Sequence, residues 1–268
     1  MNFFGIDYSA SRFARKKIWI SECETEKNKL LIKSTYSLEE ISNKFTLQKC
    51  NTYIYDLVKQ DKNSIFGFDF SFSIPDFFLK DSSWEDLIFT FKKRWKTADD
   101  FKKDLLKKSG GKELKRDTEI ESKVPFSTYN LWIYKQTYYG ISEIIYPLLE
   151  SKICNIIPFN KLDKDIPSIM ETCPASFLKF ISEKNDLSKH YKGKNKENFE
   201  NRKLILNLLE KNFSIKYTSD HLKNKILSDT EGDSLDSLLC GVCAMKGYLN
   251  LKNTMNNLKS KKEGYVFY

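Results

Sequence analysis

Three short apolar runs in this chain each end in a carboxylate, and this pattern limits the folds that the chain can adopt. The runs are Phe3-Phe4-Gly5-Ile6-Asp7, Ile65-Phe66-Gly67-Phe68-Asp69 and Ile166-Pro167-Ser168-Ile169-Met170-Glu171. Buried strands have this composition, and carboxylates at the ends of neighbouring strands converge at one edge of a sheet. Such a cluster repels itself unless protons or divalent cations intervene. The pattern therefore indicates a metal-dependent site at the edge of a sheet.

A further acidic pair, Asp233 and Asp236, opens an apolar helical pattern near the C-terminus. Residues three apart lie on one helix face, so both side chains can reach a common metal ion. Each carboxylate also has a purely structural alternative. Asp7 can cap a turn, Asp233 can be an N-cap, and Glu171 precedes a helix start, where acidic residues are favourable. Asp69 stands in an apolar setting, where a charge needs a partner.

The composition is that of a globular protein with a basic surface. A chain of 268 residues with 40% hydrophobic residues can bury a full core. Its net charge of +9 favours polyanions such as nucleic acid, although a general lysine and asparagine bias gives the same sign. No apolar run approaches the roughly 18 residues of a membrane span, and no signal-peptide pattern is present. We therefore expect a cytoplasmic protein that does not insert into membranes.

The chain alternates between strand-like and helix-like patterns. Strands are predicted over residues 2–7, 17–23, 30–36 and 64–69 and before Glu171. Helical spacing predicts helices over residues 199–213 and 233–247, and residues 184–197 read as a polar surface loop. Between about residues 80 and 125, capping signals and a high density of lysine predict a basic helical insertion. We expect a single α/β domain over residues 1–268 that contains this insertion.

The six cysteines are scattered through predicted strands and helices, which favours reduced, buried thiols over a disulfide framework. Cys240 and Cys243 form a lone C-x-x-C pattern inside a predicted helix. A zinc site needs more ligands, so we expect these two thiols to pack in the core. His190 and His221 lie in polar segments, and we expect both at the surface.

The acidic motifs and their order along the chain resemble those of the ribonuclease H superfamily, and within it a family of predicted RNase-H-like nucleases. The segments that carry the resemblance are Gly5-Ile6-Asp7-Tyr8-Ser9, Gly67-Phe68-Asp69-Phe70-Ser71-Phe72-Ser73-Ile74-Pro75, Lys115-Arg116-Asp117-Thr118, Glu171-Thr172-Cys173-Pro174-Ala175, Asp233 to Leu239, and Glu263-Gly264-Tyr265-Val266. They span essentially the whole chain; each is short, and their order is the specific feature. More distantly, the late Asp-x-x-Asp helix resembles that of Holliday-junction resolvases.

The resemblance implies a mixed five-stranded sheet, with three antiparallel strands followed by two parallel ones, flanked by helices. It also implies a nuclease that hydrolyses phosphodiester bonds of DNA or RNA with two Mg²⁺ or Mn²⁺ ions. Asp7 would bridge both ions, Asp69 would hold one of them, and Asp236 together with Asp233 would hold the other. Glu171 would be a further catalytic carboxylate that acts as a ligand or orients a water.

Three basic residues are candidates for contacts with the phosphates of a nucleic acid, namely Arg12, Lys115 and Arg116. Two other functions remain open. One is a nucleic-acid-binding or protein-interaction module that keeps the fold without catalysis. The other is an actin-like or sugar-kinase-type ATPase, which needs glycine-rich phosphate loops, whereas adjacent glycines occur here only at Gly110-Gly111. The resolvase resemblance also leaves a homodimer open.

Overall fold

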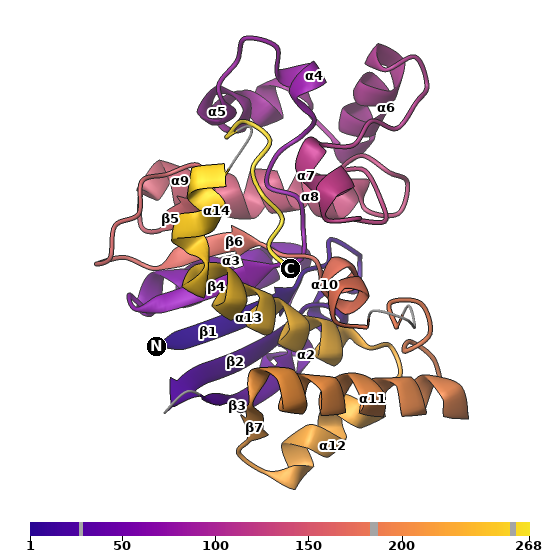
Figure 1. Cartoon of the computed structure of the whole chain (residues 1–268). Helices are drawn as coiled ribbons and strands as arrows, with labels where there is room; N and C mark the ends of the chain where they lie inside the picture. Colours follow the sequence, from indigo (N-terminus) through magenta and orange to yellow (C-terminus); the bar gives the residue numbers. More distant parts are fainter. Residues whose placement is uncertain (27–28, 183–186, 258–260) are drawn as a thin grey trace.

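One mixed sheet with helices on both faces forms the centre of the protein (Figure 1). The computed structural model describes residues 1–26, 29–182, 187–257 and 261–268. In these residues the sheet has seven strands in the order β5-β6-β4-β1-β2-β3-β7. The strands are β1 (Asn2–Asp7), β2 (Trp19–Glu26), β3 (Lys29–Ser37), β4 (Ser64–Phe68), β5 (Asn155–Ile157), β6 (Ser168–Glu171) and β7 (Ile215–Tyr217). The predicted α/β class is confirmed.

The strand directions divide the sheet into two parts. β1 pairs antiparallel with β2, and β2 pairs antiparallel with β3. On the other side of β1, β4 and then β6 follow as parallel strands. The prediction of five strands misses β5 and β7, which pair in parallel with β6 and β3 at the two edges. Each has three residues, too few for a pattern of alternating hydrophobicity to show in the sequence.

Each face of the sheet has its own hydrophobic core, because alternate side chains of a strand point to opposite faces. Ile6 of β1 belongs to the core that includes α3 (Leu47–Gln60). Phe3 of the same strand belongs to the core that includes α13 (Asp233–Leu249). Figure 1 shows α13 lying across the sheet. The apolar residues of β1 thus pack against the helices on both faces of the sheet.

The remaining helices outside the insertion include one long helix, α11 (Lys196–Phe213), and several shorter segments. The shorter segments are α1 (Ala14–Lys17), α2 (Leu38–Ile41), α8 (Tyr134–Gly140), the π-helical turn η1 (Ile141–Ile145), α9 (Tyr146–Ser151), α10 (Pro174–Ile181), α12 (Asp220–Ser228) and α14 (Leu251–Asn257). In the described part of the chain, no helix combines the length and apolar character that crossing a membrane requires. The predicted loop at 184–197 lies outside the described residues at positions 184–186.

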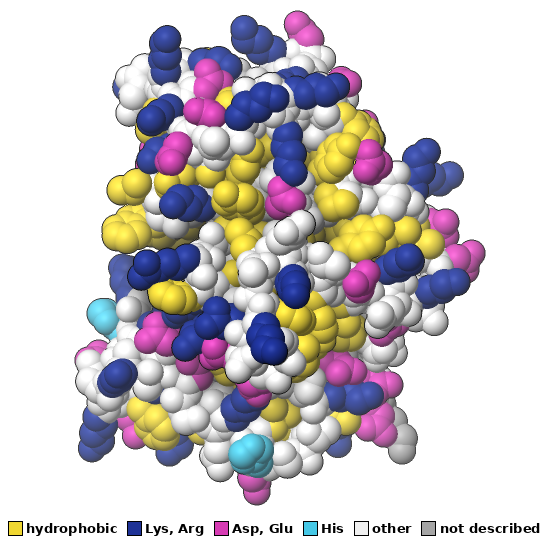
Figure 2. All heavy atoms as spheres, turned by 180° about the vertical axis from the view of Figure 1, so that it is seen from behind, with side chains coloured by type: hydrophobic (Ala, Val, Ile, Leu, Met, Phe, Trp, Pro, Cys, Tyr) yellow, Lys and Arg dark blue, Asp and Glu magenta, His cyan; other side chains and the backbone are white. Residues whose placement is uncertain are grey.

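The predicted basic insertion folds as helices that gather at one end of the sheet (Figure 1). Within residues 80–125 they are α5 (Trp84–Arg94), α6 (Ala98–Lys108) and α7 (Asp117–Glu121), and α4 (Asp76–Leu79) directly precedes this segment. Thr97 and Asp100 form a capping box at the start of α6. Gly110 and Gly111 follow this helix with φ angles of 66° and 81°, which few other residues tolerate. Figure 2 shows lysine and arginine side chains spread over this end of the molecule.

Glycines allow α13 to approach the sheet backbone to backbone. A Cβ atom on Gly5 of β1 would lie 1.8 Å from the carbonyl oxygen of Ser237 and 2.2 Å from the nitrogen of Gly241. A Cβ atom on Gly67 of β4 would lie 2.4 Å from the carbonyl oxygen of Cys240. No side chain fits at either strand position. The helix therefore rests directly on β1 and β4, which determines where its first turn lies.

This contact predicts that Gly5→Ala is strongly destabilising, whereas Gly241→Ala is not. The methyl group of Gly5→Ala meets backbone atoms that cannot move away, so we expect a loss of roughly 3 kcal/mol or more in the free energy of unfolding. On Gly241 a Cβ atom would lie no closer than 3.3 Å to its neighbours. Its crowding is offset by the better helix propensity of alanine, about 1 kcal/mol. Urea unfolding of both variants measures the difference, and equal stabilities would contradict the close approach.

Candidate active site

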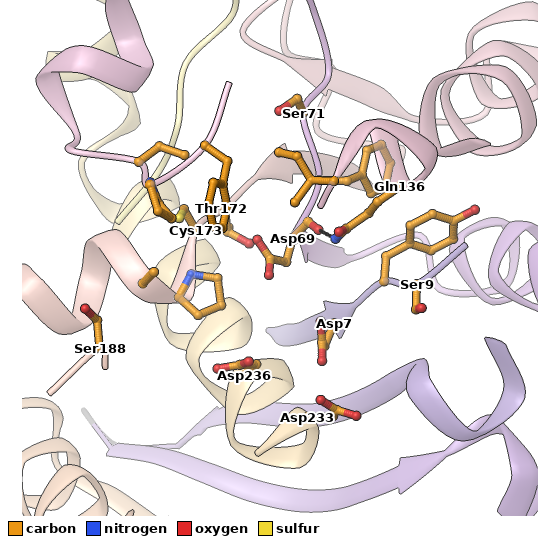
Figure 3. Close-up of a pocket in the computed structure, with 18 of the residues that line it drawn as sticks. Asp7, Ser9, Asp69, Ser71, Gln136, Thr172, Cys173, Ser188, Asp233 and Asp236 are labelled. Carbon is orange, nitrogen blue, oxygen red and sulfur yellow. Dashed lines mark hydrogen bonds between the residues drawn. The ribbon is translucent and has the colours of Figure 1, made fainter. Parts of the chain in front are cut away.

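Four aspartates from three elements border one cavity of about 540 Å³. Asp7 is the last residue of β1, Asp69 follows β4, and Asp233 and Asp236 lie in the first turn of α13. Figure 3 shows that these four side chains surround a common space. Glu171, at the end of β6, also lines the cavity. The structure therefore brings all five predicted carboxylates to the same edge of the sheet.

The sheet register places Asp7 and Asp69 side by side. β1 and β4 run in parallel with Ile6 opposite Phe68, and the amide of Asp69 donates to the carbonyl oxygen of Ile6 at 3.0 Å. Asp7, the last residue of β1, and Asp69, which directly follows β4, therefore lie side by side at the carboxyl edge of the sheet. Because α13 rests on β1 and β4, its N-terminal turn ends above the same edge. The convergence of the aspartates thus follows from strand register and glycine packing.

The alternative role of Asp233 as a helix N-cap is wrong. Gly232, with a φ angle of 77°, occupies the N-cap position, and the amide of Ser234 donates to the carboxylate of Asp229 at 2.8 Å. The carboxylate of Asp233 instead accepts a hydrogen bond from Lys17 Nζ at 3.1 Å. Its side chain therefore lines the cavity as a partner of Lys17 and does not cap the helix.

Protein donors lie within hydrogen-bond distance of three of the four carboxylate oxygens of Asp233 and Asp236, and the fourth has a lysine ammonium group within ion-pair distance. Lys192 Nζ lies 2.6 Å from Asp236 Oδ2 and 3.7 Å from Asp233 Oδ1. The hydroxyl of Tyr191 donates to Asp236 Oδ1 at 2.6 Å, and Lys17 holds Asp233 Oδ2. We did not predict these three partners from the sequence. The only signal was a pair of lysine-rich segments, which look like ordinary surface in a chain with this composition.

Asp7 and Asp69 differ from this pair. No residue in the described ranges forms a hydrogen bond or ion pair with either carboxylate. Burial, followed by the charge of Asp236, raises the pKa of Asp7 well above its usual value. The same two causes raise the pKa of Asp69 to about 7. The charge of Lys192 acts in the opposite direction on both groups without cancelling these causes, so within the described cavity lining these two carboxylates are the least compensated.

The donor set suits a hard divalent cation. Mg²⁺ and Mn²⁺ prefer carboxylate oxygens, and a bound cation would relieve the repulsion that raises the pKa of Asp7 and Asp69. As the side chains stand, no three His, Cys, Asp or Glu residues within the described ranges enclose a metal position. Lys192 draws two of the carboxylates to itself, so binding of an ion requires small side-chain movements. The residues fit the cation in chemistry and charge.

Glu171 has a different partner from the four aspartates. Its carboxylate accepts hydrogen bonds from the guanidinium of Arg116, with Nη1 at 2.8 Å, and from the amide of Phe72 at 2.8 Å. Arg116 is fully buried and also binds Glu119 and the carbonyl oxygen of Glu263. The predicted contact of Arg116 with nucleic acid needs correction, because no phosphate reaches an interior guanidinium. Both carboxylate oxygens of Glu171 accept hydrogen bonds from Arg116. The structure therefore gives no support to its predicted catalytic role.

The other two basic candidates lie outside the cavity lining. Arg12 is exposed, and its guanidinium lies 4.6 Å from the ring centre of Phe13. Lys115 donates to the carbonyl oxygens of Val124 and Pro125, two residues that do line the cavity. Lys115 therefore supports the cavity wall from behind. Contact of Arg12 or Lys115 with nucleic acid stays a prediction.

The rest of the cavity has an apolar wall and a basic rim. The apolar residues are Phe70, Val124, Pro125, Phe126, Ile133, Pro174 and Ala175, and the lysines are Lys17, Lys179, Lys189 and Lys192. Cys173 also lines it, but burial raises the pKa of its thiol to about 12, which disfavours a nucleophilic thiolate. The carboxylates are thus the candidate reactive groups, and the walls offer both apolar and cationic contacts.

The expectations for cysteine and histidine are confirmed. Cys240 and Cys243 are free and buried within α13, in line with a packing role. His190 and His221 are both exposed. Of these two residue types, the cavity lining contains Cys173 and no histidine.

The raised pKa of Asp69 predicts how stability depends on pH when divalent ions are absent. The folded chain keeps this proton up to about pH 7, whereas the unfolded chain releases it near pH 4, so stability falls as the pH rises between these values. Each unit of upward shift costs about 1.4 kcal/mol. Asp69→Asn should therefore be more stable than wild type at pH 8 by more than about 1 kcal/mol, and about equal to it at pH 4.

Urea unfolding in EDTA at the two pH values measures this difference. The exposed Asp81 provides the control, since Asp81→Asn removes a carboxylate without relieving any clustered charge. A destabilised Asp69→Asn variant at pH 8 would contradict the unpaired state of Asp69.

The buried ion pair predicts a contrast between two arginines. Arg116→Met leaves Glu171 and Glu119 without their cation, so we expect a loss of about 3–5 kcal/mol in the free energy of unfolding. Arg12→Met changes an exposed side chain and should stay within about 0.5 kcal/mol of wild type. Chemical denaturation of both variants at pH 7 provides the test. Similar stabilities for the two would show that the pair does not hold the insertion to the sheet.

Comparison of the chain with protein-family models, with curated proteins and with solved structures gives no significant match. The resemblance to the ribonuclease H superfamily therefore stays a prediction, and inference of function depends on the chemistry of the cavity itself.

Proposed function

We propose that this protein is a metal-dependent nuclease that hydrolyses phosphodiester bonds of DNA or RNA. The observation that carries the proposal is the convergence of Asp7, Asp69, Asp233 and Asp236 on one cavity, where the described residues offer Asp7 and Asp69 no partner. Carboxylates that are largely withdrawn from solvent and have no hydrogen-bonding partner are costly, and this cost is characteristic of sites that bind cations. Mg²⁺ or Mn²⁺ is the cofactor that this donor set suits.

The residues around the cavity would have different roles in such a reaction. Asp7 and Asp69 would hold a cation, which supplies charge stabilisation for the phosphate and activation of a water. Lys17 and Lys192 orient the carboxylates of Asp233 and Asp236 by ion pairs. The surrounding burial lowers the local dielectric and strengthens each of these interactions.

The strand order supports an RNase-H-like fold, which we include in the proposal. β3, β2 and β1 are antiparallel neighbours, and β4 and β6 continue in parallel from β1. These five strands have the order and directions that the resemblance implies. In this proposal β5 and β7 are additions at the two edges, and α5 to α7 belong to an insertion into a single domain.

The cavity walls support a nucleic-acid substrate. A phosphate near the carboxylates would have the lysine rim beside it, and the apolar residues from Val124 to Phe126 offer a surface for a sugar or base. An ATPase is less well supported, because the glycine pair Gly110-Gly111 ends α6 and does not line the cavity. The catalytically inactive alternative differs from the proposal only in activity, so the same assay separates the two.

The proposal predicts cleavage that depends on a divalent ion and on the aspartates. Purified protein is incubated with single-stranded, double-stranded and branched DNA and RNA in Mg²⁺, Mn²⁺ or EDTA. We expect cleavage of at least one substrate with either ion and none in EDTA. Asp7→Asn and Asp69→Asn keep the side-chain shape but remove the charge that holds the ion, so each should lower the rate by more than about a hundredfold.

Asp56→Asn is the matched control, since Asp56 is an exposed residue of α3 and should retain full activity. Cleavage at wild-type rates by Asp7→Asn and Asp69→Asn would exclude the proposed site, and so would activity in EDTA.

A further inference from the structure

The backbone around Lys192 is anchored on both sides. Arg202 of α11 donates through Nη1 to the carbonyl oxygens of Tyr191, at 2.5 Å, and Gly193, at 3.0 Å. The amide of Gly193 also donates to the carbonyl oxygen of Thr230 at 2.6 Å, in the turn before α13. The position of Lys192 is therefore set by α11 and by the same turn that leads into the acidic helix.

The side chains of this segment fit closely against the start of α13. A Cβ atom on Gly232 would lie 3.0 Å from both Tyr191 Cε2 and Lys192 Cγ. From this position the Tyr191 hydroxyl and Lys192 Nζ each reach one oxygen of Asp236 at 2.6 Å. A lysine on a mobile surface segment would have neither this anchored backbone nor these close contacts with Gly232 and Asp236. Lys192 is built into the site, although its side chain is 48% exposed.

The charges of the site separate into two pairs. Asp233 and Asp236 have Lys192 as a shared cation, with Lys17 on the outer oxygen of Asp233. Asp7 and Asp69 feel the charge of Lys192 but form no hydrogen bond or ion pair with it or with any other described residue, so once deprotonated they add two negative charges. One divalent ion balances these two charges. A second ion would add two positive charges beside an ammonium group that already occupies its ligands, which Coulomb repulsion opposes.

We infer that Lys192 is the second cation of this site. One divalent ion binds at Asp7 and Asp69, and the ammonium group of Lys192, held by Asp233 and Asp236, takes the place that a second ion would fill. This inference rests on the proposed function and replaces the two ions that the resemblance implied. It makes Lys192 a positively charged contact for the phosphate of the substrate, since an ammonium group can donate to a phosphate oxygen.

Counting bound Mn²⁺ ions tests the inference without any activity measurement. The full-length protein is titrated with Mn²⁺ alone, and electron paramagnetic resonance gives the number of ions bound per chain. We expect one ion for wild type and two for Lys192→Met, because removal of the ammonium group frees the oxygens of Asp233 and Asp236 for a second ion. Lys192→Arg keeps the positive charge and should bind one ion.

Two further sets of variants assign the ion to its ligands. Lys194→Gln removes a neighbouring exposed lysine outside the cavity lining and should still bind one ion. The double variant Asp7→Asn/Asp69→Asn should bind none, whereas Asp236→Asn should keep its single ion. Circular dichroism before each titration confirms that every variant is folded.

The outcomes separate this inference from the proposed function. Two ions in wild type, or one ion in a folded Lys192→Met variant, would overturn the role of Lys192 and leave a metal-dependent nuclease intact. No ion in wild type would overturn the proposed function, and the inference with it. One ion in wild type together with two in Lys192→Met supports both.

Discussion

The backbone contact between α13 and the sheet is the constraint on which the candidate site depends. Gly5 and Gly67 lie in neighbouring parallel strands, and neither has room for a Cβ atom beneath the helix. Because the helix is held at backbone distance, its first turn reaches the edge where β1 and β4 end. A larger residue at Gly5 would lift the helix and carry Asp233 and Asp236 away from Asp7. The packing of α13 and the convergence of the aspartates therefore depend on the same pair of glycines.

Charge is distributed unevenly around this contact. Glu171 is neutralised by the interior guanidinium of Arg116, which also ties the helical insertion to the end of β6. Asp236 is neutralised by Lys192 from the loop before α11. Of the cavity carboxylates, Asp7 and Asp69 are the two that form no hydrogen bond or ion pair with any residue described, although the charge of Lys192 acts on both. A protein interior tolerates such charges only with a proton or a bound cation, so the empty partner positions point to the chemistry of the site.

Local sequence rules were sufficient where the responsible residues are neighbours in the chain. The capping box at Thr97 and the packing role of Cys240 follow from patterns a few residues long, and both are present in the structure. The short strands β5 and β7 were not predicted, because three residues are too few to show the alternation of apolar and polar residues that marks a strand. Arg116 was misread because its motif reveals its charge but not its burial. Burial depends on segments such as β6, which lies far along the chain.

The sequence by itself determined the α/β class, the acidic ends of β1 and β4, and the acidic start of α13, because strand and helix periodicity and local composition encode them. Only the tertiary structure decided which carboxylates have partners. Ion pairs such as Lys192 with Asp236 and Arg116 with Glu171 join residues 44 and 55 positions apart. Their formation depends on strand register and helix packing, and a lysine that neutralises a site has no local signature to distinguish it from a lysine on the surface.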